Sequence, residues 1–198
     1  PGKIYPEPCA AAAKKICEYQ QDFVQRHLFV FVNILKIFCL QKEQELGNLD
    51  FDDRSHQLGG LPLLSTDFDS WLQLSDWDRL HAAFLDIQAY WNILERKRVE
   101  LEKEEKAHSW LRKTRISLPQ RFRHIQLDLR DLMNQVSSQM RFTRRSWIRP
   151  TPAPVHLSSE RGRDWDSRVE GYIALRDLNL YLTKLARDFL LLASKRHS

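Results

Sequence analysis

The chain has very little glycine, with six residues in 198. Such a low number argues against sheet-rich folds and against the glycine-rich loops that cradle phosphates. No segment alternates between apolar and polar residues over the length of a strand, so no sheet is predicted. No run is long enough to span a membrane, because the strongly apolar segment Leu28 to Leu40 has only 13 residues and includes Asn33 and Lys36. These absences favour a helical fold, and the length is most simply one domain over residues 1–198.

Cysteine is also scarce and confined to the first 39 residues, at Cys9, Cys17 and Cys39. If that region is one helix, none of the three can reach another, since a disulfide requires α-carbons within about 7 Å. They are therefore free thiols, or one of them pairs outside the chain, and the compartment stays open. The sequence begins at Pro1, without an initiator Met and without a signal-like segment. Such a start is typical of a truncated or mature chain.

Motifs for catalysis and metal binding are missing. No nucleophile-elbow, Walker or dinucleotide motif occurs, and no two histidines lie three or four residues apart as a helical metal pair requires. Asp128 and Asp131 share a helix face among Arg123, His124 and Arg130, a pattern that favours surface ion pairing over acid–base chemistry. We therefore predict that the chain is not an enzyme and has no catalytic residues, no metal site and no cofactor.

Charge is abundant but unevenly distributed. The net charge is +5, from 31 Lys/Arg and 26 Asp/Glu. Residues 108–198 contain 18 Lys/Arg and 8 Asp/Glu (+10), which leaves 13 and 18 (−5) for the first 107 residues. Because both signs are interspersed, this distribution fits protein partners better than nucleic acid.

Apolar residues at helical spacing predict four helices, over roughly residues 10–44, 75–106, 118–142 and 165–194. The second begins where Ser75 can cap it, with Asp78 three residues later, and the third begins near Ser117 with Pro119 in its first turn. Glu95 to Lys106 is interpreted as a solvated helix end. The apolar stripes of the first three helices are Ile16, Phe23, Val30 and Ile37; Trp77, Leu80, Phe84, Ile87, Trp91 and Leu94; and Phe122, Ile125, Leu129, Leu132, Val136 and Met140.

The connections predict the topology of the bundle. About 30 residues separate the first two helices, about 10 the second and third, and about 20 the last two. The short middle connection makes its two helices antiparallel, whereas the long ones can cross the length of the bundle. We expect an all-α, long-chain four-helix bundle with up-up-down-down topology.

The last helix has the clearest apolar stripe and an aromatic residue at its start. The stripe comprises Trp165, Tyr172, Leu175, Leu178, Leu182, Leu185, Phe189 and Leu192. Arg168, Arg176, Lys184 and Arg187 lie off the stripe. A large aromatic at a helix start is either part of the core or an anchor for a partner, and the spacing alone leaves both interpretations open for Trp165.

A basic stretch, Arg141 to Arg149, has Phe142 and Trp147 among its arginines. Arginine with interleaved aromatics can bind nucleic acid, and sulfated glycans are a second possibility. The stretch is short and no recognition fold accompanies it, so a solvated helix end and loop is the favoured interpretation.

Three segments together resemble one protein family. Trp71 to Leu80 (WLQLSDWDRL) is similar to a W-x-x-L-S-D-x-E-R-L motif, and Leu127 to Leu132 (LDLRDL) matches a motif of the third helix. The last helix fits without a gap. The family is the interleukin-27 alpha subunit, in the interleukin-6/interleukin-12 group of helical cytokines. The first helix matches poorly, and the acidic run of mammalian members is absent, with Arg144 to Pro154 in its place.

The resemblance implies a secreted, extracellular cytokine subunit with the cytokine form of the predicted topology. Its partners would be a soluble receptor-like beta subunit of the Epstein-Barr-virus-induced type, the shared glycoprotein-130 receptor and the interleukin-27 receptor alpha chain. The pair would trigger JAK-STAT signalling in immune regulation, without nucleic acid or membrane insertion. By position, Trp165 resembles the tryptophan that meets the shared receptor, and Arg187 resembles the arginine that meets acidic groups of the beta subunit.

Other functions stay open at this stage. Near alternatives are an alpha subunit of another interleukin-12-type cytokine and a single-chain interleukin-6-like cytokine. An intracellular helical adaptor and a basic nucleic-acid-binding bundle are more remote. The sequence has no N-glycosylation sequon that would support secretion.

Overall fold

The computed structural model describes residues 58–62, 68–107, 117–143, 148 and 164–194. Within these ranges the chain is helical and has no strand, which confirms the all-α fold class. The helices are α2 (Phe68–Gln73), α3 (Asp76–Ala107), α4 (Leu118–Thr143) and α5 (Asp164–Ser194). The bounds predicted for the last three long helices are correct to within one residue at each end. The helix predicted over residues 10–44, with its three cysteines, lies outside the described residues.

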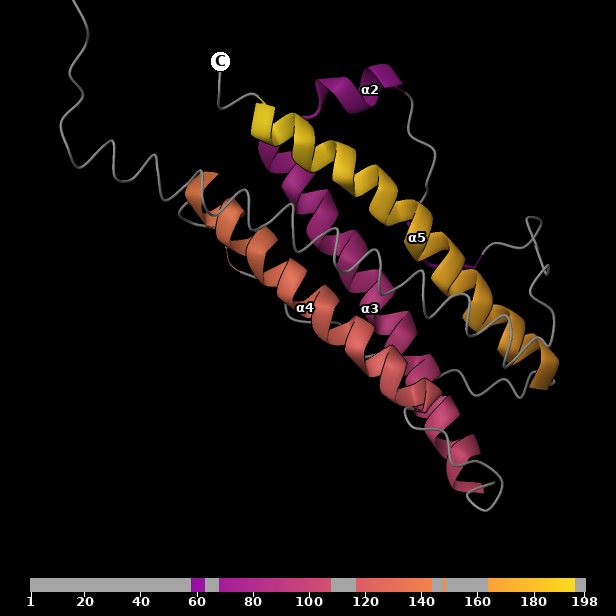
Figure 1. Cartoon of the computed structure of the whole chain (residues 1–198). Helices are drawn as coiled ribbons and strands as arrows, with labels where there is room; N and C mark the ends of the chain where they lie inside the picture. Colours follow the sequence, from indigo (N-terminus) through magenta and orange to yellow (C-terminus); the bar gives the residue numbers. More distant parts are fainter. Residues whose placement is uncertain (1–57, 63–67, 108–116, 144–147, 149–163, 195–198) are drawn as a thin grey trace, which may run out of the picture.

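The three long helices lie side by side with α3 in contact with both of the others (Figure 1). Arg79, near the start of α3, contacts Asp188 near the end of α5. Lys97, farther along α3, contacts Glu170 near the start of α5. Helix α5 is therefore antiparallel to α3. Helix α4 also runs antiparallel to α3 and therefore parallel to α5. These directions are those of the last three helices in an up-up-down-down bundle. The complete four-helix topology includes residues outside the described ranges.

Capping hydrogen bonds begin the two helices of the α3–α4 hairpin. The Ser75 hydroxyl accepts a hydrogen bond from the backbone N–H of Asp78 at 3.1 Å, as the sequence predicts. At the start of α4, the side chain of Gln120 accepts a hydrogen bond from the backbone N–H of Ser117 at 3.2 Å. In a capping box, this is the hydrogen bond from the backbone N–H of the N-cap residue to the side chain three residues later. Pro119 occupies the first turn, where the missing N–H of proline removes no helical hydrogen bond.

The core is built from the predicted apolar stripes. All six predicted residues of α4 are buried, and so are Tyr172, Leu175, Leu178, Leu182, Leu185 and Phe189 of α5. In α3 the stripe is wider than predicted, because Tyr90 and Ala83 are buried beside Leu80, Phe84, Ile87 and Leu94. Trp77 and Trp91 are only partly buried at its edge.

No helix in the described part of the chain is both long and apolar enough to cross a membrane.

Two features occur where the sequence predicts only a connection. The short helix α2 lies beside the C-terminal end of α5 (Figure 1). Leu58 to Pro62 forms a turn in which Gly60 has a φ of 84°, a left-handed value that favours glycine. Leu58 packs against Tyr172 and Ile173 of α5, so this turn covers part of its outer surface.

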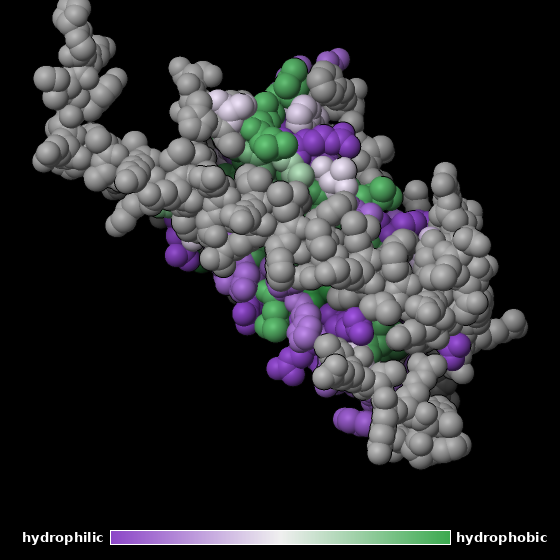
Figure 2. Space-filling view, viewed as in Figure 1, coloured by the Kyte–Doolittle hydropathy of each residue, from purple (hydrophilic) through white to green (hydrophobic). Residues whose placement is uncertain are grey.

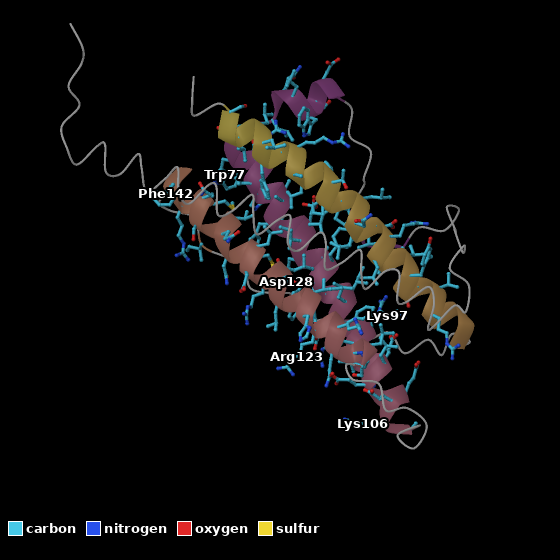
Figure 3. The ribbon with its side chains drawn as sticks, viewed as in Figure 1. Trp77, Lys97, Lys106, Arg123, Asp128 and Phe142 are labelled. Atoms are coloured by element: carbon cyan, nitrogen blue, oxygen red, sulfur yellow. The ribbon has the colours of Figure 1, made fainter. Side chains whose placement is uncertain are left out.

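The interpretation of Glu95 to Lys106 as a solvated helix end is only partly right. Residues 103–107 are exposed, but Lys97 is buried between α3 and α5, with 3% of its side chain exposed. Its ammonium group pairs with Glu100 at 2.8 Å and also with Glu170 of α5. Figure 3 shows the contrast, with Lys97 between the helices and Lys106 at the free end of α3. Burial of a lysine is tolerable here because two carboxylates neutralise its charge.

Candidate partner-binding surface

The outer side of α5 carries exposed residues of mixed chemistry. Leu180, Thr183, Arg187 and Leu190 recur at steps of three and four residues, so they lie along one side of the helix. We call these four residues the outer stripe. Leu180 and Leu190 are 50% and 59% exposed, which is high for leucine and leaves apolar surface on both sides of a single cation.

Arg187, which the resemblance assigns to the beta subunit, is exposed in the middle of the outer stripe. Among the described residues it has no ion-pair partner. A guanidinium can donate in a planar fork to a carboxylate, so an acidic group of another protein fits this position. The sequence prediction that Arg187 lies off the apolar stripe is confirmed.

Asp188 follows Arg187 directly but points into the protein. Only 9% of its side chain is exposed, and its carboxylate accepts a hydrogen bond from the Arg79 Nη1 group at 2.8 Å. The indole N–H of Trp71 in α2 donates to the same carboxylate oxygen. Successive residues on a helix differ by about 100° in direction, which is why these neighbours serve different surfaces.

Arg79 completes this cluster, which we call the Arg79 cluster (Trp71, Arg79 and Asp188). The Arg79 side chain is 1% exposed, and its Nη2 group donates to the carbonyl of Trp71 at 2.7 Å. Its guanidinium carbon also lies 4.7 Å from the centre of the Trp71 ring, a cation–π arrangement. The cluster therefore joins α2, the start of α3 and the end of α5.

The sequence did not predict the Arg79 cluster. In the sequence, Trp71 and Arg79 belong to one motif and Asp188 belongs to the last helix, far from both. A weak signal was available, because Arg79 has the same phase as Ala83, Asp86 and Tyr90, which form the side of α3 toward α5. Pairing across 109 residues, however, follows from the packing of the helices and not from any local pattern.

Ionisable groups also meet in the middle of the α3–α5 interface. The rings of Tyr90 and Tyr181 are 5.2 Å apart, and burial raises the pKa of both phenols well above the usual range. Burial also raises the pKa of Asp86, an effect that the Lys184 ammonium and the Tyr181 hydroxyl partly offset. Perturbed pKa values can mark reactive sites, but both tyrosines are buried inside a helix interface, which is an ordinary structural cause.

Trp165 lies in the first turn of α5, as expected. Its side chain lies outside the described residues, so the choice between core residue and receptor anchor stays a prediction. The two predicted site residues are 22 positions apart on one helix. At a rise of 1.5 Å per residue they are roughly 33 Å apart along the axis, which places them in separate binding regions.

The remaining predicted surface features lie on α4. Arg130 and Asp131 form an exposed ion pair at 3.1 Å, which agrees with surface pairing for this acidic motif. From the basic stretch, Arg141 and Phe142 are exposed, the latter by 69%, while most of the stretch lies outside the described residues. In the described ranges no three His, Cys, Asp or Glu side chains come together as a metal site.

Hydrophobic and hydrophilic residues are both visible on the described helices. Figure 2 shows hydrophobic residues near α2 and the C-terminal end of α5, whereas the visible side of α4 is mainly hydrophilic. A protein interface generally needs an apolar centre with few charges. The outer stripe meets this requirement better than the exposed side of α4.

Comparison with known proteins identifies no family: no protein-family model matches the chain, and no match was found among curated proteins.

Proposed function

We propose that this chain is a secreted cytokine alpha subunit that pairs with a soluble receptor-like beta subunit. The pair then engages the shared glycoprotein-130 receptor and a specific alpha receptor, and triggers JAK-STAT signalling in immune cells. The proposal includes the four-helix, up-up-down-down topology, with the predicted first helix completing the three described long helices. It starts from the resemblance to the interleukin-27 alpha subunit family.

The positions of the motif residues support this proposal. Residues Trp71 and Arg79 of the first motif meet Asp188 of the last helix in the Arg79 cluster. Leu129 and Leu132 of the LDLRDL motif are buried in the core that α3 and α5 share. Motif segments that are far apart in the sequence thus contact one another or share one core, as expected if the three motifs belong to one fold.

The single observation that carries the functional proposal is the outer stripe. Arg187 is exposed between Leu180 and Leu190, which are also exposed. Arginine is enriched among the residues that dominate binding energy, and surrounding apolar side chains exclude water from such a contact. An acidic, partly apolar surface on the beta subunit would complement it.

The test is a charge reversal, Arg187→Glu, measured in a binding titration with a soluble beta subunit of the Epstein-Barr-virus-induced type. We expect a loss of about 2 kcal/mol or more in binding free energy, roughly thirtyfold in Kd, because like charges would face each other. The melting temperature should change little, since an exposed charge rarely contributes more than about 0.5 kcal/mol.

Arg168→Glu is the matched control, because Arg168 is also exposed on α5 but lies near its other end. This variant should bind the beta subunit normally. Equal affinity of the Arg187 variant and the parent would remove Arg187 from the interface. A parent chain that is a stable monomer and forms no complex with the beta subunit would favour a single-chain cytokine instead.

A further inference from the structure

Helix α2 is too short to hold its own position. It has six residues, and isolated helices of fewer than about 12 residues are marginal in water. The side chains of Asp69, Ser70, Leu72 and Gln73 are all exposed. Trp71 is the least exposed of the α2 side chains that the structure describes, and its contacts tie α2 to α3 and α5.

Those contacts come from two buried charges on two other helices. Asp188 of α5 accepts the hydrogen bond from the Trp71 indole, and Arg79 of α3 donates to the Trp71 carbonyl at 2.7 Å. Arg79 also donates to Asp188 at 2.8 Å, so each of the three residues contacts the other two. A lysine could not reproduce this geometry, because a single ammonium nitrogen would replace the two guanidinium nitrogens that reach separate acceptors.

Two exposed leucines lie on the elements that the Arg79 cluster joins. Leu72 follows Trp71 on α2, and Leu190 lies two residues after Asp188 on α5; they are 50% and 59% exposed. Figure 1 shows α2 beside this end of α5. Because α2 lies beside the end of α5 at which the outer stripe ends, Leu72 adds exposed apolar surface at this end of the molecule only while α2 stays in place.

We infer that the Arg79–Asp188 pair is a clamp that sets the position of α2, and that Arg79 is thereby a positioning residue for the partner-binding surface. The clamp stands on the contacts within this chain alone, whereas the positioning role rests on the proposed function. Arg79 itself is buried and touches no partner. It acts by holding Trp71, and through Trp71 the exposed Leu72.

The experiment removes both charges together, in the variant Arg79→Met/Asp188→Leu, because removing only one would leave a buried unpaired charge. A thermal melt first establishes that the variant folds. The readout on the isolated chain is hydrogen exchange of the Trp71 indole N–H, observed by nuclear magnetic resonance and assigned with Trp71→Phe. We expect exchange to accelerate by about tenfold or more, because the N–H loses its buried acceptor.

Two further variants complete the design. Arg130→Met/Asp131→Leu removes an exposed ion pair on α4 and should leave indole exchange unchanged. Arg79→Lys serves if the double variant does not fold, since it keeps the charge but has one donor nitrogen in place of two. It should accelerate indole exchange by a smaller factor than the double variant.

The second readout is the Kd for the soluble beta subunit, which we expect to rise about tenfold in the double variant with the outer stripe intact. Unchanged indole exchange would overturn the clamp. Faster exchange with unchanged affinity would overturn the positioning role. A parent chain that does not bind the beta subunit would overturn the proposed function, and with it the positioning role, while indole exchange still decides on the clamp.

Discussion

Asp188 and Arg187 are neighbours with opposite surroundings, and this difference gives the sharpest stability prediction. The substitution Asp188→Ala removes the acceptor of two hydrogen bonds, from Arg79 and from the Trp71 indole. It leaves the guanidinium of Arg79, which is 1% exposed, without its counter-charge. Little water can reach the guanidinium to take the place of the carboxylate.

Breaking a buried ion pair by removing one partner costs about 3–5 kcal/mol. Because Asp188 keeps 9% of its side chain exposed, some water can reach the site, and we expect the lower end, about 3 kcal/mol. For a chain of this size, each kcal/mol lowers the melting temperature by about 2–4 °C, so the expected decrease is about 6–12 °C.

The assay is thermal unfolding followed by far-ultraviolet circular dichroism, with urea unfolding as a second measure of the free energy. Asp131→Ala is the control, because this aspartate also pairs with an arginine but is half exposed. It should alter the free energy of unfolding by about 0.5 kcal/mol or less. A cost below about 1 kcal/mol for Asp188→Ala would refute the argument that the Arg79 charge is truly buried.

Three further predictions concern separate parts of the chain. If Trp165 is a receptor anchor, Trp165→Ala should weaken binding to the shared receptor by about 2 kcal/mol with little change in melting temperature. If Trp165 is a core residue, the same substitution should lower the free energy of unfolding by about 3–5 kcal/mol and leave binding intact. Phe122→Ala should lower the free energy of unfolding by about 3–5 kcal/mol in urea titrations, because this fully buried ring packs in the main core; a loss under about 1 kcal/mol would contradict that packing. Burial raises the pKa of Asp86, so the folded protein binds this proton more tightly than the unfolded chain and loses stability as the pH rises above about 4. Asp86→Asn should therefore be more stable than the parent at pH 7, with the difference closing below about pH 4; a difference that is constant from pH 3 to 7 would contradict this assignment.

The helices of the described region were predictable because their signals are local. The caps at Ser75 and Ser117 involve atoms only three residues apart, and stripes such as Phe122 to Met140 follow from the geometry of a single helix. The bounds of α3, α4 and α5 could therefore be given in advance. Helix α2 could not, since a six-residue helix has too few residues to show a period and depends on tertiary contacts.

The candidate surface was predictable only in part. The exposure of Arg187 follows from its phase relative to the apolar stripe of α5. The burial of Lys97 does not follow, because Glu95 to Lys106 is charged at every position except Val99 and Leu101, and each of its charges could face water. Its burial depends on Glu170, a carboxylate 73 positions away that α5 brings into contact.

The sequence by itself determined that the described region is helical, where α3, α4 and α5 begin and end, and which apolar residues form most of their shared core. These properties depend on residues within a few positions of one another, and the low glycine content and helical periodicity specify them directly. Only the tertiary structure decided which charges are buried and which are exposed. Arg79, Lys97 and Asp188 are as polar as Arg187, and they differ from it because a distant helix supplies, or does not supply, an opposite charge.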